Sequence, residues 1–331
     1  MANILNYAKR NTKSFDEVPF NAVDSLVLST IAYIDFAFLF KSDYKIIIKD
    51  IPLKKININK IKLKDADKYI KLLGYVHDNP RYNGGILRDY VEIASDSDET
   101  HFNAMTFVYD DFSYVAFMGT GASLMDWKED FKLAYLNYVP AQRYAKEYLD
   151  KMMKLIYGDF YVGGHSKGGN LACYSATYTK LLNKLRIKEV FSHDGPGFNK
   201  RVYNSLGYRS IKNKINKTVP SSSLVGMLFF SRVKYKIIKS SGFSFLQHSP
   251  FTWLVKNNDF IYLEDRAWDS KYADNILTDW LDSLTKKEIE TFVEALFNIL
   301  SEVDYSSIDI TRYKFFNIIK VVKKGTQKLD P

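Results

Sequence analysis

Residues 159–172 read DFYVGGHSKGGNLA, and this stretch decides the fold. It opens with a β-prone run from Asp159 to Val162 and continues into a helix pattern from Lys167 to Leu185. A second β-prone run follows from Glu189 to Ser192. A strand, a helix and a strand in this order predict a βαβ unit with parallel strands and a right-handed crossover.

The turn between the first strand and the helix carries a nucleophile pattern. Gly164-His165-Ser166-Lys167-Gly168 fits Gly-x-Ser-x-Gly, in which a strained turn pushes the serine hydroxyl out of the sheet. A larger side chain at either glycine would collide with the neighbouring strand or helix. Because five residues alone are not specific, the strand before and the helix after are what predict Ser166 as a nucleophile.

A serine hydroxyl is a weak nucleophile at neutral pH, so it needs a histidine to take its proton. His248 follows Ser166 and fits the chain order serine, acid, histidine of this elbow type. We therefore predict His248 as the base, with an ordinary loop histidine as the alternative. The other four histidines precede the serine, adjoin it or end the next strand: His77, His101, His165 and His193.

The acid that orients the histidine is expected between Ser166 and His248, where the carboxylates are Glu189 and Asp194. Glu189 opens a strand and would lie at its wrong end. Asp194 follows that strand and would lie at the carboxyl edge of the sheet, where such sites assemble. We predict Asp194 as the acid, and a turn aspartate bonded by the following Gly-Pro-Gly backbone is the alternative.

Acyl transfer also needs N–H donors directed at the developing oxyanion. The backbone amide of Lys167, at the amino end of the elbow helix, is predicted to supply one. A β-hairpin is predicted over Ala104–Tyr109 and Ser113–Met118, and Gly119-Thr120 ends its second strand. The amide of Thr120 is the predicted second donor, and a tight turn without chemistry is the alternative.

These motifs resemble the class 3 lipases, in which a strand ends in Gly-Thr, an Asp-Trp follows and Gly-His-Ser-Leu-Gly-Gly carries the nucleophile. The corresponding residues here are Gly119-Thr120, Asp126-Trp127 and Gly164 to Gly169. The resemblance implies an α/β-hydrolase fold, with a mostly parallel central sheet flanked by helices. It also implies a serine esterase or lipase that forms an acyl-enzyme at Ser166 and needs no metal or organic cofactor.

More closely, the chain resembles a bacterial lipase-like family known as a domain of unknown function. The stretches that carry this likeness are Pro19 to Leu26, Ser166 to Asn170, Asp194 to Phe198 and Gln247-His248.

Two positions depart from the lipase pattern. Met118 stands where the lipases usually have arginine, and Lys217-Thr218 stand before Val219-Pro220, where the lipases place their acid. The resemblance therefore transfers the serine and the histidine but not the acid, and Asp194 resembles the pancreatic-lipase arrangement instead. The unfilled acid position leaves a catalytically weak or inactive lipid-binding or regulatory protein as the alternative function.

The 331 residues, 46% of them apolar, predict a single α/β-hydrolase domain over residues 1–331, with a core at roughly 20–303. Residues 201–247 are predicted to include a candidate lid before the histidine, because Leu224 to Leu246 is apolar and basic by turns. Plain core packing is the alternative. Residues 304–331 are predicted as a basic C-terminal segment.

Local patterns predict further elements. A helix is expected over Val23 to Phe40, and another opens at Pro140. Residues 43–64 alternate lysine with isoleucine, which fits an exposed strand or an irregular connection equally well.

The composition bears on partners and location. The 47 Lys and Arg residues exceed the 38 Asp and Glu residues, which leaves a net charge of +9 that could favour an anionic membrane or nucleic acid. The excess is dispersed lysine with abundant Ile, Asn and Tyr, and no recognition motif accompanies it, so we expect no nucleic acid. We expect an ester or lipid substrate and, as a candidate, peripheral contact with an anionic membrane. The oligomeric state is not predicted.

The cellular location is predicted from segments the sequence lacks. The amino terminus does not have the order of a secretory signal, and the apolar run from Leu26 to Phe40 is too short to span a bilayer. The single cysteine, Cys173, allows no intrachain disulfide. These features predict a cytoplasmic protein.

Overall fold

The computed structural model describes residues 2–40, 45–61, 63, 65–95, 100–120, 132, 133, 136, 138–223, 225–227, 233–265, 285, 287–289 and 291. The chain divides into two compact units, residues 1–278 and 279–331. The extent of the predicted single α/β-hydrolase domain stays a prediction. The helices and strands named below all lie in the first unit. The predicted basic segment 304–331 lies outside the described residues.

The described residues form a nine-stranded sheet in the order β1-β2-β3-β4-β5-β6-β7-β8-β11. Neighbours from β4 to β8 are parallel, whereas β1 to β4 and the pair β8 and β11 are antiparallel. A further antiparallel pair joins β9 to β10. The strands are β1 (Lys45–Ile47), β2 (Ile86–Ser95), β3 (Thr100–Val108), β4 (Phe112–Phe117), β5 (Asp159–His165), β6 (Ile187–His193), β7 (Ile215–Pro220), β8 (Tyr235–Ile238), β9 (Val255–Lys256), β10 (Asp259–Phe260) and β11 (Tyr262–Leu263).

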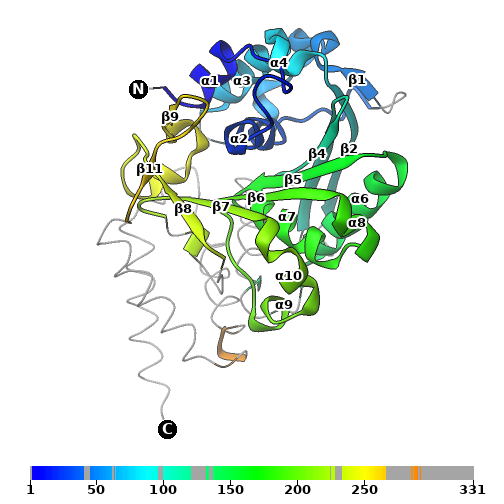
Figure 1. Ribbon diagram of the computed structural model, residues 1–331, viewed down its shortest axis with the longest axis vertical. Helices are drawn as coiled ribbons and strands as arrows, with labels where there is room; N and C mark the ends of the chain where they lie inside the picture. The colour runs from blue at the N-terminus through cyan, green and yellow to red at the C-terminus, as the bar shows by residue number, and fades with distance from the viewer. Residues whose placement is uncertain are drawn as a thin grey trace. The chain divides into compact units, whose positions relative to one another are not determined.

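Helices cover both faces of this sheet. In Figure 1, α1 to α4 lie above the strands, whereas α6 to α10 lie below them. The helices are α1 (Ile4–Arg10), α2 (Ala22–Ile31), α3 (Ala66–Asp78), α4 (Pro80–Asn83), α6 (Pro140–Leu155), α7 (Lys167–Tyr178), α8 (Leu181–Arg186), α9 (Lys200–Tyr203) and α10 (Leu206–Ile211). A sheet whose central strands β4 to β8 are parallel, between two helical layers and with a nucleophile turn between β5 and α7, is the α/β-hydrolase fold that the sequence predicted.

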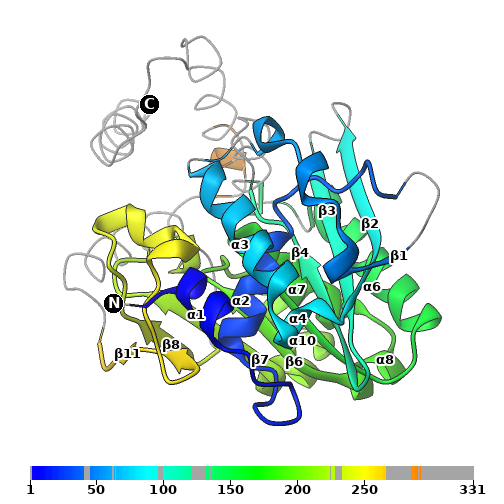
Figure 2. The same ribbon diagram turned by 90° about the horizontal axis from the view of Figure 1, so that it is seen from above.

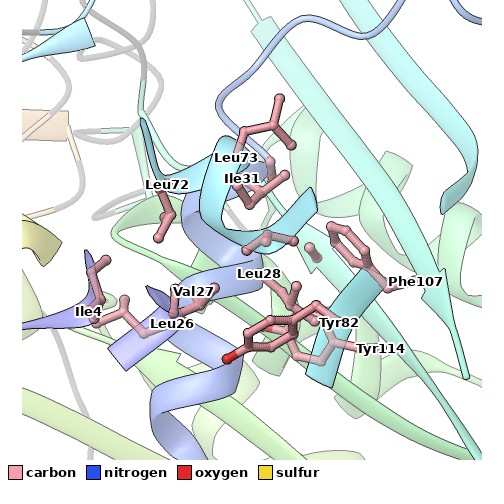
Figure 3. Packing of buried hydrophobic residues seen from close by; sticks show 14 of the residues in the cluster. Ile4, Leu26, Val27, Leu28, Ile31, Leu72, Leu73, Tyr82, Phe107 and Tyr114 are labelled. Carbon is pink, nitrogen blue, oxygen red and sulfur yellow. The ribbon is translucent and has the colours of Figure 1, made fainter. Parts of the chain in front are cut away.

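Strand β4 shows how the two layers are built. Its residues are all buried, and successive side chains point to opposite faces. Tyr114 and Ala116 join the apolar cluster of α1 to α4, whereas Val115 and Phe117 join that of α6 and α7. Figure 2, seen from above, shows α1, α2 and α3 together in front of the strands. Figure 3 shows the first cluster from nearby, with the leucines and isoleucine of α2 packed against α3 and the sheet.

The predicted hairpin and βαβ unit are confirmed. Strands β3 and β4 pair antiparallel, and β5 and β6 pair parallel on either side of α7. The helix predicted from Lys167 to Leu185 is two helices, α7 and α8, divided at Thr179-Lys180. The Thr179 hydroxyl donates to Asp150 of α6 at 2.5 Å. Because this contact is tertiary, the local sequence pattern did not reveal the division.

The amino-terminal segment differs from prediction in two ways. Helix α2 ends at Ile31, although apolar residues continue to Phe40, and the turns that follow bury Ala32, Tyr33, Ile34 and Phe36. The core starts before residue 20, since Ile4 and Tyr7 of α1 are buried. Residues 43–64, where described, contain both expected alternatives, with β1 followed by three 3-10 turns: Ile48–Asp50, Leu53–Lys55 and Ile58–Lys60.

The predicted lid range was too wide. Of residues 201–247, β7 and β8 are parallel strands of the central sheet and α10 packs against α7, so these parts belong to the core. Because apolar and basic residues alternate in this range, the sequence pattern did not reveal these strands. Residues 224 and 228–232 lie outside the described residues. Within the described part of the chain, no helix is long and apolar enough to cross a membrane.

Candidate active site

Ser166 lies in a strained turn between β5 and α7. Its φ is 58° and its ψ is −133°, a backbone conformation that L residues rarely adopt. The Ser166 amide donates to the His193 carbonyl at 2.9 Å, and the Ser166 carbonyl accepts from the Gly169 amide at 2.9 Å. These bonds hold the turn to β6 on one side and to α7 on the other.

The two glycines of the pattern are required by close packing. A Cβ on Gly164 would lie 2.2 Å from the carbonyl carbon of Gly168, and a Cβ on Gly168 would lie 2.2 Å from the Phe117 oxygen. Strand β5, helix α7 and strand β4 therefore approach each other with no space for a methyl group. The collision expected from the sequence is present at both positions.

His248 lies within hydrogen-bond distance of Ser166, with its Nε2 3.0 Å from the serine Oγ. It ends the 3-10 turn Ser244–His248. The His248 carbonyl accepts from Nε2 of His165 at 2.7 Å. The preceding residue, Gln247, accepts at Oε1 from the Ser221 hydroxyl and the Ser222 amide, both at 3.1 Å. The histidine is thus fixed from the elbow side and from the end of β7.

Asp194 lies on the other side of His248, with Oδ2 2.6 Å from Nδ1. It follows β6, is fully buried and has a φ of 51°. Its amide donates to the Thr218 carbonyl of β7 at 2.7 Å. Its Oδ1 accepts from the Gly226 amide at 3.1 Å and from the Ser223 hydroxyl. The structure therefore brings Ser166, His248 and Asp194 into one chain of hydrogen bonds.

The charge of Asp194 determines which atoms donate in these hydrogen bonds. Burial alone would raise the pKa of the carboxyl, but the hydrogen bond and charge of His248 and the Ser223 hydroxyl together lower it. An ionised carboxylate only accepts, so Nδ1 of His248 donates to it. Nε2 of a neutral His248 is then an acceptor, and the Ser166 hydroxyl donates to it. In this state the ring can take the serine proton.

Two further histidines lie nearby and are neutral. Burial, and then the charge of His248, lower the pKa of His165 to about 3, and burial lowers that of His193 to about 3. His193 packs as expected, with Nδ1 2.8 Å from the Thr218 hydroxyl and Nε2 2.9 Å from the Ser25 hydroxyl. Neither bonds the Ser166 hydroxyl among the contacts of the described residues.

The predicted oxyanion donors lie on either side of the serine in the fold. Lys167 is the first residue of α7, and its buried side chain donates to the His101 carbonyl at 3.2 Å. On the other side, a Cβ on Gly119 would lie 3.0 Å from Cβ of Ser166, so the end of β4 passes close to the nucleophile. Thr120 follows Gly119 directly and is half-buried. Donation by the Lys167 and Thr120 amides stays a prediction, and Asp126-Trp127 lie outside the described residues.

Three partners of this site were not found from the sequence. Ser223 and Gly226 bind the carboxylate of Asp194, and His165 binds the carbonyl of His248. The serines at 221–223 come directly after a strand, which is the only available signal. The bond from His165 depends on the position of a loop more than eighty residues away in sequence, so the sequence had no signal for it.

The sheet order, the elbow and the hydrogen-bonded serine, histidine and aspartate define a lipase-like α/β-hydrolase. The chain belongs to the Mbeg1-like family, whose model matches residues 76–298. This confirms the resemblance to a lipase-like family. No curated protein matches the chain.

Several solved lipase structures are similar to the chain at low identity. The M37 lipase is 13% identical with a TM-score of 0.41, over 63% of this chain and 70% of that one. The lipase of Rhizopus microsporus var. chinensis is 13% identical with a TM-score of 0.40, over 72% and 78%. The Rhizomucor miehei lipase propeptide complex is 16% identical with a TM-score of 0.39, over 72% and 71%. The sheet and the elbow define the α/β-hydrolase class independently of these similarities.

Proposed function

We propose that this protein is a serine hydrolase that cleaves a carboxylic ester of a lipid or of an acylated small molecule. The observation that carries the proposal is the chain of hydrogen bonds from the Ser166 hydroxyl through His248 to the buried Asp194. A hydroxyl, an imidazole and an ionised carboxylate in this order are the groups that acyl transfer through a serine requires.

In the proposed reaction, Oγ of Ser166 attacks the ester carbonyl carbon while Nε2 of His248 takes its proton. The resulting oxyanion accepts from the amides of Lys167 and Thr120. The alcohol then leaves with the proton from His248, and an acyl group stays on Ser166. Water, activated by His248, releases the acid and restores the serine. Asp194 keeps the proton on Nδ1 throughout and stabilises the imidazolium.

A fluorophosphonate probe tests the proposal, because it phosphonylates only an activated serine. We expect the wild-type protein to be labelled, Ser166→Ala to abolish labelling, and His248→Ala to slow it on the order of a thousandfold or more. His77→Ala is the matched control. His77 and Asp78 form a surface pair with a 2.6 Å contact of the same kind, and its loss should leave labelling unchanged.

An unlabelled wild-type protein would favour the second function, a lipid-binding or regulatory protein on a lipase scaffold. The same outcome, with a folded protein, would remove the enzymatic proposal.

The candidate lid has a separate place in the proposal, which is to control access to the site. Lys234, Lys236 and Lys239 are exposed, with Lys236 in β8 and the other two on either side of it. We propose that the candidate lid, Leu224 to Leu246, regulates access to Ser166. Replacing the three lysines with serine should change the ratio of kcat/KM for a long-chain ester to that for a small soluble ester, and an unchanged ratio removes this role.

A further inference from the structure

Helix α8 exposes three leucines to solvent. Leu181, Leu182 and Leu185 are 72, 75 and 73% exposed, and Leu206, which opens α10, is 82% exposed. Leucine is among the residues most often buried in soluble proteins, so four such side chains in one region are unusual. At these exposures the side chains protrude from the surface and do not line a groove.

These leucines lie on neighbouring elements. Helix α10 lies beside α8, because Nζ of Lys184 donates to the Ser210 hydroxyl at 3.2 Å. The end of α6 lies beside α8 as well, because Arg186 donates to the Met153 carbonyl at 2.6 Å. Two more exposed apolar residues follow Met153. We call this surface the leucine edge: Leu155, Tyr157, Leu181, Leu182, Leu185 and Leu206.

The leucine edge lies opposite the candidate active site. Its residues come just before the starts of β5, β6 and β7, whereas Ser166 and Asp194 follow the ends of β5 and β6. The seven residues of β5 span about 20 Å, which separates the two edges of the sheet. In Figure 1, α8 lies at the right, and β9, which follows the turn of His248, lies at the left.

The leucine edge is also strongly cationic. Residues 178–188 and 206–214 contain seven lysines and arginines and neither aspartate nor glutamate. Several of these cations donate to carbonyl oxygens, which do not neutralise them. Arg186 bonds the Gly158 carbonyl at 2.9 Å, and Lys214 bonds the Lys184 carbonyl at 2.8 Å.

Carboxylates near the leucine edge offset part of this charge. Asp159 pairs with Lys188, which is one of the seven cations, and Glu189 follows Lys188 in β6. Asp150 pairs with Lys146. The positive charge of the surface is therefore in excess.

We propose that the leucine edge docks on an anionic lipid membrane. Protruding leucines insert into the boundary between headgroups and acyl chains, and the surrounding cations meet lipid phosphates. A second copy of this chain fits the surface less well, because a symmetric contact would bring like charges together. A deformable lipid surface accommodates protruding side chains without a preformed pocket.

The proposal does not depend on the proposed esterase function. It also has a geometric consequence, because docking at this edge leaves Ser166 accessible from water. A vesicle-bound protein should therefore turn over a soluble ester as fast as the free protein.

Cosedimentation of the full chain with vesicles tests the proposal. We expect binding to phosphatidylcholine vesicles that contain about one third phosphatidylglycerol and not to pure phosphatidylcholine, with loss of binding at about 0.5 M salt. The triple variant Leu181→Ser, Leu182→Ser, Leu185→Ser should lower affinity about tenfold or more. The double variant Lys180→Glu, Arg209→Glu should do the same without touching an apolar side chain.

The matched control is Ile58→Ser. Ile58 is 42% exposed, and it lies on the 3-10 turn Ile58–Lys60, outside the leucine edge. It should bind anionic vesicles as the wild type does. Thermal unfolding of each variant shows whether it is folded, and the charge variant keeps the test decisive if the leucine variant is not.

Three outcomes would overturn the proposal. The first is a wild-type protein that does not bind anionic vesicles. The second is binding that both variants leave unchanged, or that only the substitutions at Lys234, Lys236 and Lys239 abolish. The third is a wild-type dimer in solution that the leucine variant converts to a monomer without any change in vesicle binding, which would make the leucine edge an interface between copies.

Discussion

Asp194 is a buried carboxylate whose two oxygens have different partners. Oδ2 accepts from His248, and Oδ1 accepts from the Gly226 amide and the Ser223 hydroxyl. These bonds compensate for the burial of the charge and lower the pKa of the carboxyl. The side chain therefore stays ionised and rigid, which suits a group that fixes the tautomer of a neighbouring imidazole.

Replacing this carboxylate tests its role. In Asp194→Asn the amide can donate to Nδ1, so His248 would hold its proton on Nε2 and could not accept from Ser166. We expect kcat for a soluble ester to fall on the order of 10⁴-fold, with a smaller change in KM, measured by steady-state kinetics.

Glu189→Gln is the matched control, because Glu189 is the other carboxylate between Ser166 and His248 in the sequence. Its kcat should stay near the wild-type value. If Asp194→Asn kept kcat within tenfold of the wild type, the assignment of the acid would be wrong.

The sequence was enough to predict that Ser166, His248 and Asp194 lie together, because motif, chain order and sheet edge each depend on local pattern. Their supporting bonds were not predictable. The bonds from Ser223 to Asp194 and from His165 to the His248 carbonyl depend on loop positions that tertiary packing determines. The amides that would bind an oxyanion stay predictions for the same reason.

At the scale of elements, the elbow depends on the close approach of β4, β5 and α7. Gly164 and Gly168 face each other, and Gly168 also faces the carbonyl of Phe117. Backbone atoms cannot move aside as a flexible side chain can, so this contact fixes both the position of α7 and the strained turn before it.

Two glycine substitutions of opposite expected sign test this packing. Gly168→Ala should lower the free energy of unfolding by about 1–3 kcal/mol, because its Cβ would meet backbone atoms. Gly74→Ala, in the middle of α3 with no atom within 4 Å of the new Cβ, should raise it by about 0.5–1 kcal/mol. Denaturant unfolding of both variants measures the difference. A Gly168→Ala variant as stable as the wild type would contradict the packing described.

Element prediction succeeded where periodicity and turn residues agreed, as in the β3 and β4 hairpin and in α6 after Pro140. It was wrong where apolar residues continued beyond an element. Helix α2 ends at Ile31 although Ala32 to Ile34 are also buried, and β7 lies inside the range predicted as a lid. Buried turns after α2 continue its apolar pattern, whereas Asn216, Lys217 and Thr218 interrupt the apolar pattern of β7.

At the scale of the whole molecule, buried neutral histidines join the layers of the fold. His193 ends β6 and lies at hydrogen-bond distance from Ser25 of α2 and Thr218 of β7. His165 ends β5 and connects the elbow to the turn of His248. Protonation of either ring would place a charge inside the protein, and burial lowers the pKa of each to about 3.

These histidines predict how stability depends on pH. Below pH 6.5 each histidine of the unfolded chain gains a proton that the folded protein excludes until about pH 3. Acid therefore favours the unfolded state, and stability should fall by about 1.4 kcal/mol per pH unit for each ring between these limits.

His193→Gln removes one of the two rings. The slope of unfolding free energy against pH, measured by denaturant unfolding between about pH 6 and pH 4, should decrease by about 1.4 kcal/mol per pH unit. The comparison uses the slope because the variant also loses packing. An unchanged slope would show that His193 is already protonated in the folded protein.

The position of Asp194 also affects how such chains are recognised in sequence surveys. A search that requires a carboxylate before the Val219-Pro220 pair would score this chain as an inactive lipase relative. The carboxylate that bonds His248 instead comes from the end of the adjacent parallel strand, β6. Surveys of inactive relatives in this superfamily should therefore examine the ends of both strands before they count an acid as lost.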